Sequence, residues 1–142
     1  MNAWTKMIEP PEIQIRFADI DVMGHVNNAV YLSYLEYTRV YYFQKLLGMN
    51  WDWGKKGVLL IKNEVEYLKP ILLNDKPQIE MFIGKTGNKS FTFHYEIRVN
   101  SILYTKALSV MVSYDALDKK TIQIPDEMKK SFSLLKNYTA SA

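Results

Sequence analysis

The segment from residue 29 to residue 47 contains neither glycine nor proline, and most of its residues are Tyr, Leu, Val or Phe. Gly48 follows this segment and is a typical stop signal for a helix. Asn27 and Asn28 precede it, and an asparagine can cap a helix by accepting a hydrogen bond from an unpaired backbone N–H. The pattern predicts one long helix. Because apolar residues occur all around its circumference, this helix should be buried on most sides.

Alternation of apolar and polar residues predicts strands on both sides of the helix, and a mostly apolar run predicts a last strand buried on both faces. One half-buried strand is expected before it, at residues 12–17. Gly87 and Asn88 form a short turn, so the strands that flank this turn should pair as a hairpin. Pro125 opens a short segment, around residues 126–135, that is expected to be helical. The strands expected after the helix lie at residues 59–67, 78–83, 91–99 and 103–114.

One long helix covered by one curved sheet satisfies all these periodicities together. We therefore predict an α+β fold in which a curved antiparallel sheet of five or six strands wraps one long central helix. No repeat, low-complexity tract or linker divides the chain, so residues 1–142 should form a single domain. Such a sheet leaves its other face and its edges open. Pairing with a second subunit is a common solution, so a homodimer or homotetramer is expected.

Composition excludes several classes of site. The chain has no cysteine and only two histidines, far apart in sequence, so neither a thiolate nucleophile nor a zinc site is expected. Neither a Gly-x-Ser-x-Gly elbow nor a phosphate-binding glycine loop occurs. The net charge of +3 is too weak and diffuse to predict a nucleic-acid partner. No apolar run or signal pattern predicts membrane insertion or export, so a cytoplasmic location is expected.

Residues suited to catalysis are concentrated just before the helix, between Asp19 and Asn28. This stretch contains two carboxylates, an imidazole and two amides. The N-terminus of a helix presents unpaired N–H groups and a partial positive charge, which favour an anion or a developing oxyanion. A carboxylate beside it can attack a carbonyl carbon or take a proton from water. Gly24 would let the backbone turn tightly toward a substrate.

The sequence here resembles the hotdog-fold thioesterases of the 4-hydroxybenzoyl-CoA thioesterase type. The resemblance lies in the string RFADIDVMGHVNN at residues 16–28, in the residues that follow it in the helix, and in EYLKP at residues 66–70; it covers roughly residues 12–114. It implies the hotdog fold and hydrolysis of an acyl-CoA or acyl-carrier-protein thioester to a free acid and a thiol. It further implies no metal or other cofactor, an active site at a subunit interface, and Asp21 as the catalytic carboxylate.

The loop residues have both catalytic and structural interpretations. Asp21 is expected to act as nucleophile or general base, and the alternative is a turn carboxylate that binds nearby N–H groups. His25 could orient Asp21, bind the attacking water or contact the thioester, or it could simply bind a backbone carbonyl. Asn28 is the asparagine expected to contact substrate. Asp19 is expected to hold the loop together.

Further candidates lie outside the loop. Gly24, Tyr31, Asn63 and Leu59 are the candidate substrate-binding residues, and the backbone N–H groups at the helix start or at residues 57–59 could polarise the carbonyl. Glu36 and Arg39 lie three residues apart in the helix and are expected to form an ion pair. The remaining candidates flank the Gly87-Asn88 turn, where they would bind CoA phosphates or form a solvated tip: Lys85, Lys89 and Ser90.

Two other functions stay open on the same residues. A hotdog hydratase or dehydratase would use His25 and a carboxylate for acid–base chemistry on enoyl or hydroxyacyl thioesters. A binding module would hold an acyl thioester without turning it over. The sequence leaves the acyl-chain preference and the choice between CoA and carrier protein open.

Overall fold

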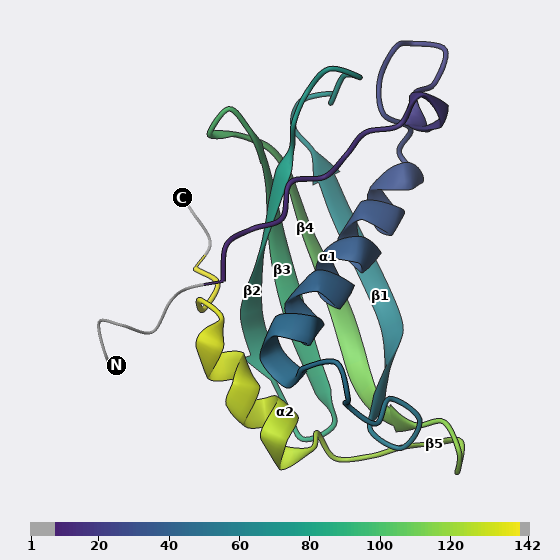
Figure 1. The fold of residues 1–142 in the computed structure, drawn as a ribbon, viewed down its shortest axis with the longest axis vertical. Helices are drawn as coiled ribbons and strands as arrows, with labels where there is room; N and C mark the ends of the chain where they lie inside the picture. Colours follow the sequence, from purple (N-terminus) through teal and green to yellow (C-terminus); the bar gives the residue numbers. More distant parts are fainter. Residues whose placement is uncertain (1–7, 140–142) are drawn as a thin grey trace.

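One long helix lies across one face of an antiparallel sheet (Figure 1). The computed structural model describes residues 8–139, and the helix is α1 (Val30–Leu47). The sheet contains β1 (Gly57–Tyr67), β2 (Gln78–Thr86), β3 (Ser90–Val99), β4 (Ile102–Asp115) and the two-residue β5 (Lys120–Thr121).

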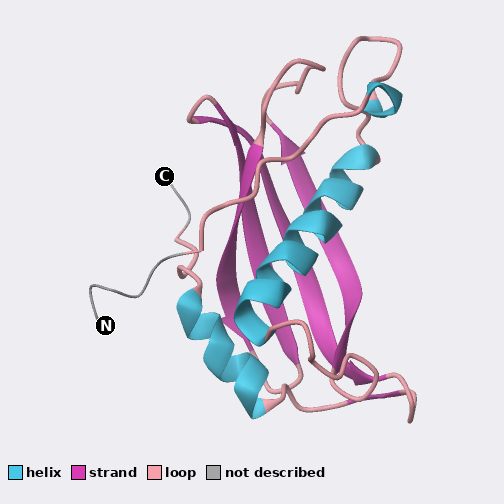
Figure 2. Ribbon diagram, viewed as in Figure 1, coloured by secondary structure: helices cyan, strands magenta, loops and turns pink. Residues whose placement is uncertain are grey.

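The strand order is β1-β4-β3-β2, with β5 paired to β4. A shorter helix, α2 (Asp126–Ser131), lies beside α1 on the same side of the sheet (Figure 2). The 3-10 turns η1 (Phe17–Asp19) and η2 (Phe132–Leu134) complete the fold. The α+β hotdog architecture, with one long helix on a sheet of five strands, is therefore confirmed, as is a helix near residue 126.

The core lies between α1 and the inner face of the sheet. Successive side chains of a strand point to opposite faces, and β3 places Phe93 and Tyr95 at alternate, fully buried positions. Phe93 packs edge-on against Phe43 of α1, with ring centroids 5.5 Å apart. The alternation seen in the sequence thus forms a continuous apolar layer beneath the helix.

Helix α1 is buried on one side only, which corrects the expectation of burial on most sides. Its buried residues recur every three or four positions, as one face of a helix requires. The opposite side carries Leu32, Tyr37 and Val40, which are 41%, 55% and 52% exposed. Within one chain, this apolar stripe has no covering element among residues 8–139.

The strand expected at residues 12–17 does not form. Only Glu12 makes a β-bridge, to Gln78 of β2. The chain then leaves the sheet because Asp19 accepts a hydrogen bond from the Arg16 backbone N–H at 2.9 Å and draws the backbone into η1. As a result Phe17, which would share the apolar face of such a strand with Ile13 and Ile15, is 84% exposed.

A β-bulge at residue 61 changes which side chains of β1 face the helix. Leu60 pairs with Met111 of β4, and the next paired residue of β1 is Lys62. After this irregularity Asn63 pairs with the buried Ser109 and faces inward. Leu59 precedes the bulge by two positions and lies on the outer face.

The two edges of the sheet differ. Along β2, the Ile79 N–H donates to the Pro11 carbonyl at 3.2 Å, and the Ile83 N–H donates to the Lys136 carbonyl at 3.0 Å. The Tyr138 N–H also donates to the Ile83 carbonyl at 2.8 Å. Segments from both ends of the described chain therefore cover this edge.

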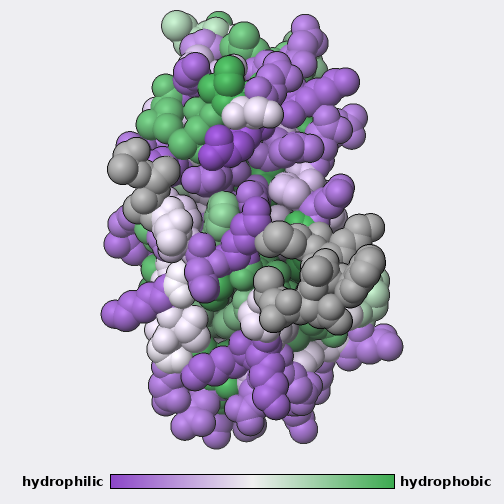
Figure 3. Space-filling model, turned by 90° about the vertical axis from the view of Figure 1, so that its left-hand side faces the viewer, coloured by the Kyte–Doolittle hydropathy of each residue, from purple (hydrophilic) through white to green (hydrophobic). Residues whose placement is uncertain are grey.

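The β1 edge is open in the single chain. None of the β-pairings among residues 8–139 uses it, and Leu59, Leu60 and Ile61 are 44%, 45% and 61% exposed. By contrast, hydrophilic residues predominate in the visible part of the face that carries α2 and the β2 edge (Figure 3). In the described part of the chain no helix has the length and apolar character needed to cross a membrane.

Candidate active site

A tight turn positions the candidate catalytic residues just before α1, in the Asp21 loop (residues 19–28). The Asp21 N–H donates to the His25 carbonyl at 2.8 Å, and the Gly24 N–H donates to the Asp21 carbonyl at 3.0 Å. Gly24 has a φ of +79°, a conformation that glycine adopts without steric cost. The loop therefore holds Asp21, Gly24 and His25 in one compact turn.

The carboxylate of Asp21 has one oxygen held by the loop and one oxygen that the loop leaves open. Oδ1 accepts hydrogen bonds from the backbone N–H groups of Met23 at 2.9 Å and His25 at 3.3 Å. Oδ2 accepts none of the side-chain hydrogen bonds found among residues 8–139. The side chain is half-buried. The turn interpretation of Asp21 thus describes Oδ1, while Oδ2 is left without a hydrogen-bond partner among the described side chains.

Asp19 holds the loop to the helix. The residue is 1% exposed, and its carboxylate accepts a hydrogen bond from the Tyr34 hydroxyl at 2.7 Å. The carboxylate also accepts from the Arg16 guanidinium at 3.0 Å. Burial opposes ionisation, but the hydrogen bonds from Arg16 and Tyr34 outweigh it and lower the pKa of Asp19. Burial and the neighbouring carboxylate raise the pKa of Tyr34. The expected structural role of Asp19 is confirmed by these contacts.

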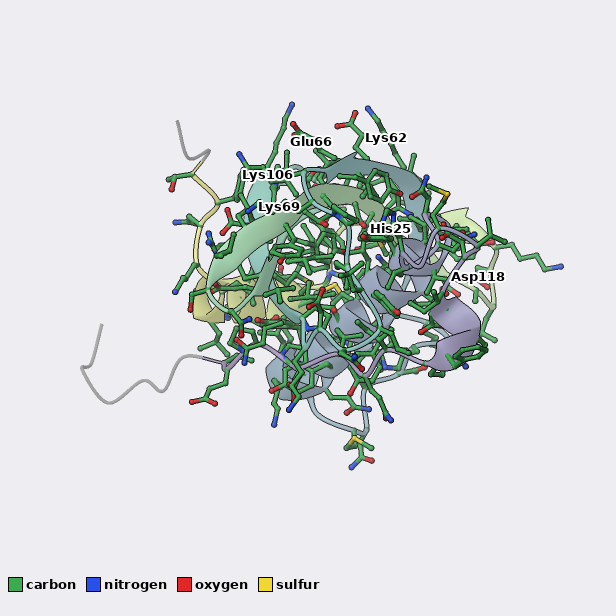
Figure 4. The ribbon with its side chains drawn as sticks, turned by 90° about the horizontal axis from the view of Figure 1, so that it is seen from above. His25, Lys62, Glu66, Lys69, Lys106 and Asp118 are labelled. Atoms are coloured by element: carbon green, nitrogen blue, oxygen red, sulfur yellow. The ribbon has the colours of Figure 1, made fainter. Side chains whose placement is uncertain are left out.

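The part of the Asp21 loop that contains His25 and Asn28 lies near the C-terminal end of β1. His25 forms an isolated β-bridge with Leu72, and the Tyr67 hydroxyl donates to the Asn28 carbonyl at 3.1 Å. Figure 4 shows His25 toward the helix side of the sheet, whereas Lys62 projects from the sheet away from α1. The imidazole is half-buried and makes no hydrogen bond to the described residues. Its structural interpretation, a bond to a backbone carbonyl, is therefore not realised.

Of the two asparagines, Asn27 stabilises the turn and Asn28 leaves its amide in solvent. The Asn27 side chain accepts a hydrogen bond from the Ala29 N–H at 2.9 Å, one residue before α1 begins. Asn28 is exposed, and its amide has no hydrogen-bond partner among residues 8–139. This amide is at the surface of the Asp21 loop and is accessible to a bound molecule.

Tyr31 belongs to the core. The residue is 2% exposed, and its ring packs edge-on against Tyr67, with centroids 4.8 Å apart. Burial raises the pKa of its hydroxyl. The position of Tyr31 therefore gives it a packing role between α1 and β1.

A pocket of about 450 Å³ opens between the C-terminal half of α1 and the start of β1. We call it the α1–β1 pocket. Its walls are mainly apolar, and its size is in the range of small-molecule sites. The lining includes Glu36, Arg39, Phe43, Trp53, Leu60 and Met111.

A buried polar cluster adjoins the pocket. Nη1 of Arg39 donates to the Tyr95 hydroxyl and to the Ser109 hydroxyl, both at 3.1 Å. The Ser109 hydroxyl donates in turn to the Asn63 side-chain oxygen at 2.6 Å. The expected Glu36–Arg39 ion pair is wrong, because Glu36 points into solvent while Arg39 is turned into the sheet.

The remaining candidate residues lie far from the loop within one chain. Leu59 and Tyr67 are eight residues apart on β1, about 26 Å at the rise of a strand. The turn with Lys85, Lys89 and Ser90 lies at the end of the sheet opposite the Asp21 loop (Figure 1). Lys89 contacts the Thr121 hydroxyl at 3.4 Å. One chain therefore brings together Asp21, Gly24, His25 and Asn28 but not these more distant candidates.

The polar cluster around Arg39 was not predicted as part of a site. Its signal in the sequence was a polar residue recurring on one face of β4, at Thr105, Ser109 and Ser113, within a strand that is otherwise mostly apolar. Of the residues in this cluster, Asn63 was the one that the sequence singled out. Its partners could not be found without knowing the register of β1 against β4.

Within residues 8–139, no three His, Cys, Asp or Glu side chains gather closely enough to hold a metal ion.

Comparison with known proteins agrees with this architecture. A family model described as the thioesterase-like superfamily matches residues 15–132. The putative acyl-CoA thioesterase YneP of Bacillus subtilis (strain 168) is 28% identical over 88% of this chain and 90% of its own length. The long-chain acyl-CoA thioesterase FadM of Escherichia coli (strain K12) is 26% identical over 84% of this chain and 92% of its own.

A solved structure gives the same result. A thioesterase of Thermus thermophilus, complexed with coenzyme A and Zn, is 30% identical and superposes with a TM-score of 0.77. The match covers 89% of this chain and 98% of that one. The chain therefore belongs to the thioesterase-like superfamily, and its enzyme class is that of the thioester hydrolases.

Proposed function

We propose that this protein hydrolyses acyl-CoA thioesters to a free acid and CoA, with Asp21 as the catalytic carboxylate. The observation that carries the proposal is the asymmetry of the Asp21 carboxylate: two backbone N–H groups fix Oδ1, and Oδ2 is left open beside the start of a helix. The partly positive helix N-terminus favours charge development there. The coenzyme A and acyl-CoA named for relatives support the substrate class.

The reaction needs one carboxylate and one water. As a general base, Asp21 takes a proton from water, whose oxygen forms the new C–O bond while the C–S bond breaks and the thiolate is protonated. As a nucleophile, Asp21 forms an acyl anhydride as the thiolate leaves, and water then hydrolyses the anhydride. His25 and the Asn28 amide would orient the water or the thioester. No metal or other cofactor takes part in the proposed reaction.

The proposal includes a homodimer in which two copies of β1 pair antiparallel across a twofold axis. The open β1 edge, with its exposed apolar side chains, supports this pairing. The Asp21 loop adjoins the Tyr67 end of β1, and the α1–β1 pocket adjoins the Gly57 end. Antiparallel pairing brings opposite ends of the strand together, so the loop of one copy would lie next to the pocket of the other.

Replacing Asp21 by Asn is the direct test. Asp21→Asn keeps the shape of the side chain but removes its charge, and we expect thiol release from acyl-CoA to fall by about a hundredfold or more, in the range of acid–base catalysis. Asp118→Asn is the matched control, because Asp118 is an exposed carboxylate near β5 (Figure 4). Thiol release is measured with a thiol-reactive dye over short, long, branched and aromatic acyl-CoAs. Near-normal turnover of Asp21→Asn on a good substrate would disprove the assignment.

A further inference from the structure

The guanidinium of Arg39 is a buried positive charge that no carboxylate of residues 8–139 neutralises. Arg39 is 8% exposed, and none of the ion pairs between described residues includes it. Its hydrogen-bond partners, Tyr95 and Ser109, are neutral hydroxyls. A buried charge without a partner of opposite sign is costly. A ligand that brings an oxygen acceptor to Arg39 would therefore bind favourably.

Arg39 is also accessible to such a ligand from the α1–β1 pocket. The pocket is lined by Arg39, and its walls are otherwise mostly apolar. Within the described residues only Nη1 of Arg39 donates hydrogen bonds, which leaves Nε and Nη2 to bind a ligand. Glu36 is the other charged residue of the lining, and its side chain is exposed. The pocket thus combines an apolar channel with a cationic donor.

We propose that the α1–β1 pocket binds the acyl group of the substrate and that Arg39 selects acyl groups with an oxygen acceptor, carboxylate or hydroxyl, at the end away from the thioester. The inference rests on the proposed thioesterase function. The apolar walls surround the hydrocarbon part of the acyl group. The planar guanidinium donates to the terminal oxygen, and Tyr95 and Ser109 fix its orientation.

The position of the pocket agrees with this use. Val30 and Arg39 are nine residues apart on α1, about 13 Å along the helix axis. Arg39 is therefore too distant to act on the thioester itself at its own chain's loop. In the proposed dimer the loop of the second copy adjoins the mouth of the pocket. The thioester then lies at the mouth, and the far end of the acyl group reaches Arg39.

Matched substrate pairs test the inference. One pair is decanoyl-CoA and its ω-carboxylated counterpart, and the other is benzoyl-CoA and 4-hydroxybenzoyl-CoA. We expect wild-type kcat/KM to favour the oxygen-bearing member of at least one pair by about tenfold or more, as a charge-assisted hydrogen bond allows. The two pairs distinguish an anionic acceptor from a neutral one. Equal or lower kcat/KM for both oxygen-bearing members overturns the inference while leaving the thioesterase function intact.

Substitutions of Arg39 test whether this residue causes the preference for oxygen-bearing acyl groups. Arg39→Gln keeps a donor toward Tyr95 and Ser109 but removes the charge, and Arg39→Met removes both. In both variants the ratio of kcat/KM between the oxygen-bearing substrate and its matched partner is expected to fall to about one. Arg98→Met is the control, since Arg98 pairs with Glu96 away from the pocket. Retention of the preference in folded Arg39→Gln overturns the inference, and absence of hydrolysis by the wild type overturns the thioesterase function itself.

A binding measurement covers the case in which the Arg39 variants do not fold. Trp53 lines the pocket, so binding of ω-carboxylated S-decyl-CoA, a thioether that cannot be hydrolysed, should change the tryptophan fluorescence of the wild type, and Trp53→Phe should lose that change. S-decyl-CoA, which has no oxygen acceptor at the end of its chain, should bind more weakly. Equal binding of the two thioethers overturns the preference without any use of the activity.

Discussion

Asp19 and Asp21 are two residues apart, yet the fold uses their carboxylates differently. Asp19 is almost fully buried and receives hydrogen bonds from a tyrosine and an arginine. Asp21 is half-buried, and its bonds come only from the backbone of its own turn. One carboxylate fixes the loop, and the other is presented by it.

This difference predicts a stability effect for Asp19. Asp19→Asn loses the charge that binds Arg16 and Tyr34, and we expect the free energy of unfolding to fall by about 1–3 kcal/mol. Because folding lowers the pKa of Asp19, its contribution is present above the unfolded value of 3.8 and is lost as the pH falls through the lower folded pKa. Urea unfolding at neutral and acidic pH measures both effects. A variant as stable as Asp118→Asn at neutral pH would contradict this account.

At the residue scale, the sequence showed which loop residues would lie together, but it did not show which residues Arg39 would contact. The string from Asp19 to Asn28 is local, so its turn brings the residues together whatever the rest of the fold does. Arg39 meets Ser109 and Tyr95 across long separations in sequence, so that contact depends on strand register. The ion pair between Glu36 and Arg39 was expected from their spacing in the helix alone. Arg39 instead donates hydrogen bonds to residues that are distant in sequence.

At the scale of elements, β1 combines a bulge with an open edge. The bulge at residue 61 turns Asn63 inward and leaves Ile61 exposed. Periodicity in the sequence found this strand, but strict alternation places Leu59, Ile61 and Asn63 on the same face, since alternation alone does not show an inserted residue. The sequence sign of the bulge was a polar residue, Asn63, at a position where strict alternation would place an apolar one.

The open edge predicts that a charge at Ile61 weakens self-association. Ile61→Lys should shift the protein toward monomer, because lysines on an edge strand oppose pairing. The fold of each copy should remain intact, since Ile61 is 61% exposed in the single chain. Sedimentation velocity over a concentration series measures the change. Leu117→Lys, which alters another exposed apolar residue, should leave association unchanged.

If Ile61→Lys and the wild type sediment alike at every concentration, the pairing through β1 is wrong. Circular dichroism distinguishes this outcome from general unfolding of the variant.

At the scale of the whole molecule, the sequence predicted the layer architecture because the helix and strands each have their own period. It could not predict how the first segment attaches. Residues 12–17 alternate like a strand, but η1 and the Asp19 contacts redirect the chain. The expected pairing of two subunits stays a prediction that the open β1 edge and the apolar stripe on α1 support.

Mixing two inactive variants tests whether an active site is shared between copies. Asp21→Asn has an intact pocket, and Gln44→Trp, which fills the pocket, has an intact loop. Mixed and reassociated in equal amounts, they should regain about a quarter of wild-type activity, because half of the dimers are mixed and each has one intact site. Thiol release before and after mixing measures the gain.

Activity that stays at the sum of the two separate variants would place the loop and the pocket of each working site in one chain. Mixing Asp21→Asn with Asp118→Asn serves as the control. Asp118→Asn keeps both an intact loop and an intact pocket, so the total activity should be the same before and after mixing.

The unequal edges of the sheet also set a limit on growth. A sheet with two unpaired edges can add strands from further molecules indefinitely and grow into a fibre. Here the N- and C-terminal segments of the described chain already occupy the β2 side. Among residues 8–139 the β1 edge is the unpaired one, and in the dimer proposed through β1 this edge would be paired in both copies. In that dimer the segments that cover β2 would stop further strand addition, so the assembly would end at two copies instead of growing into a fibre.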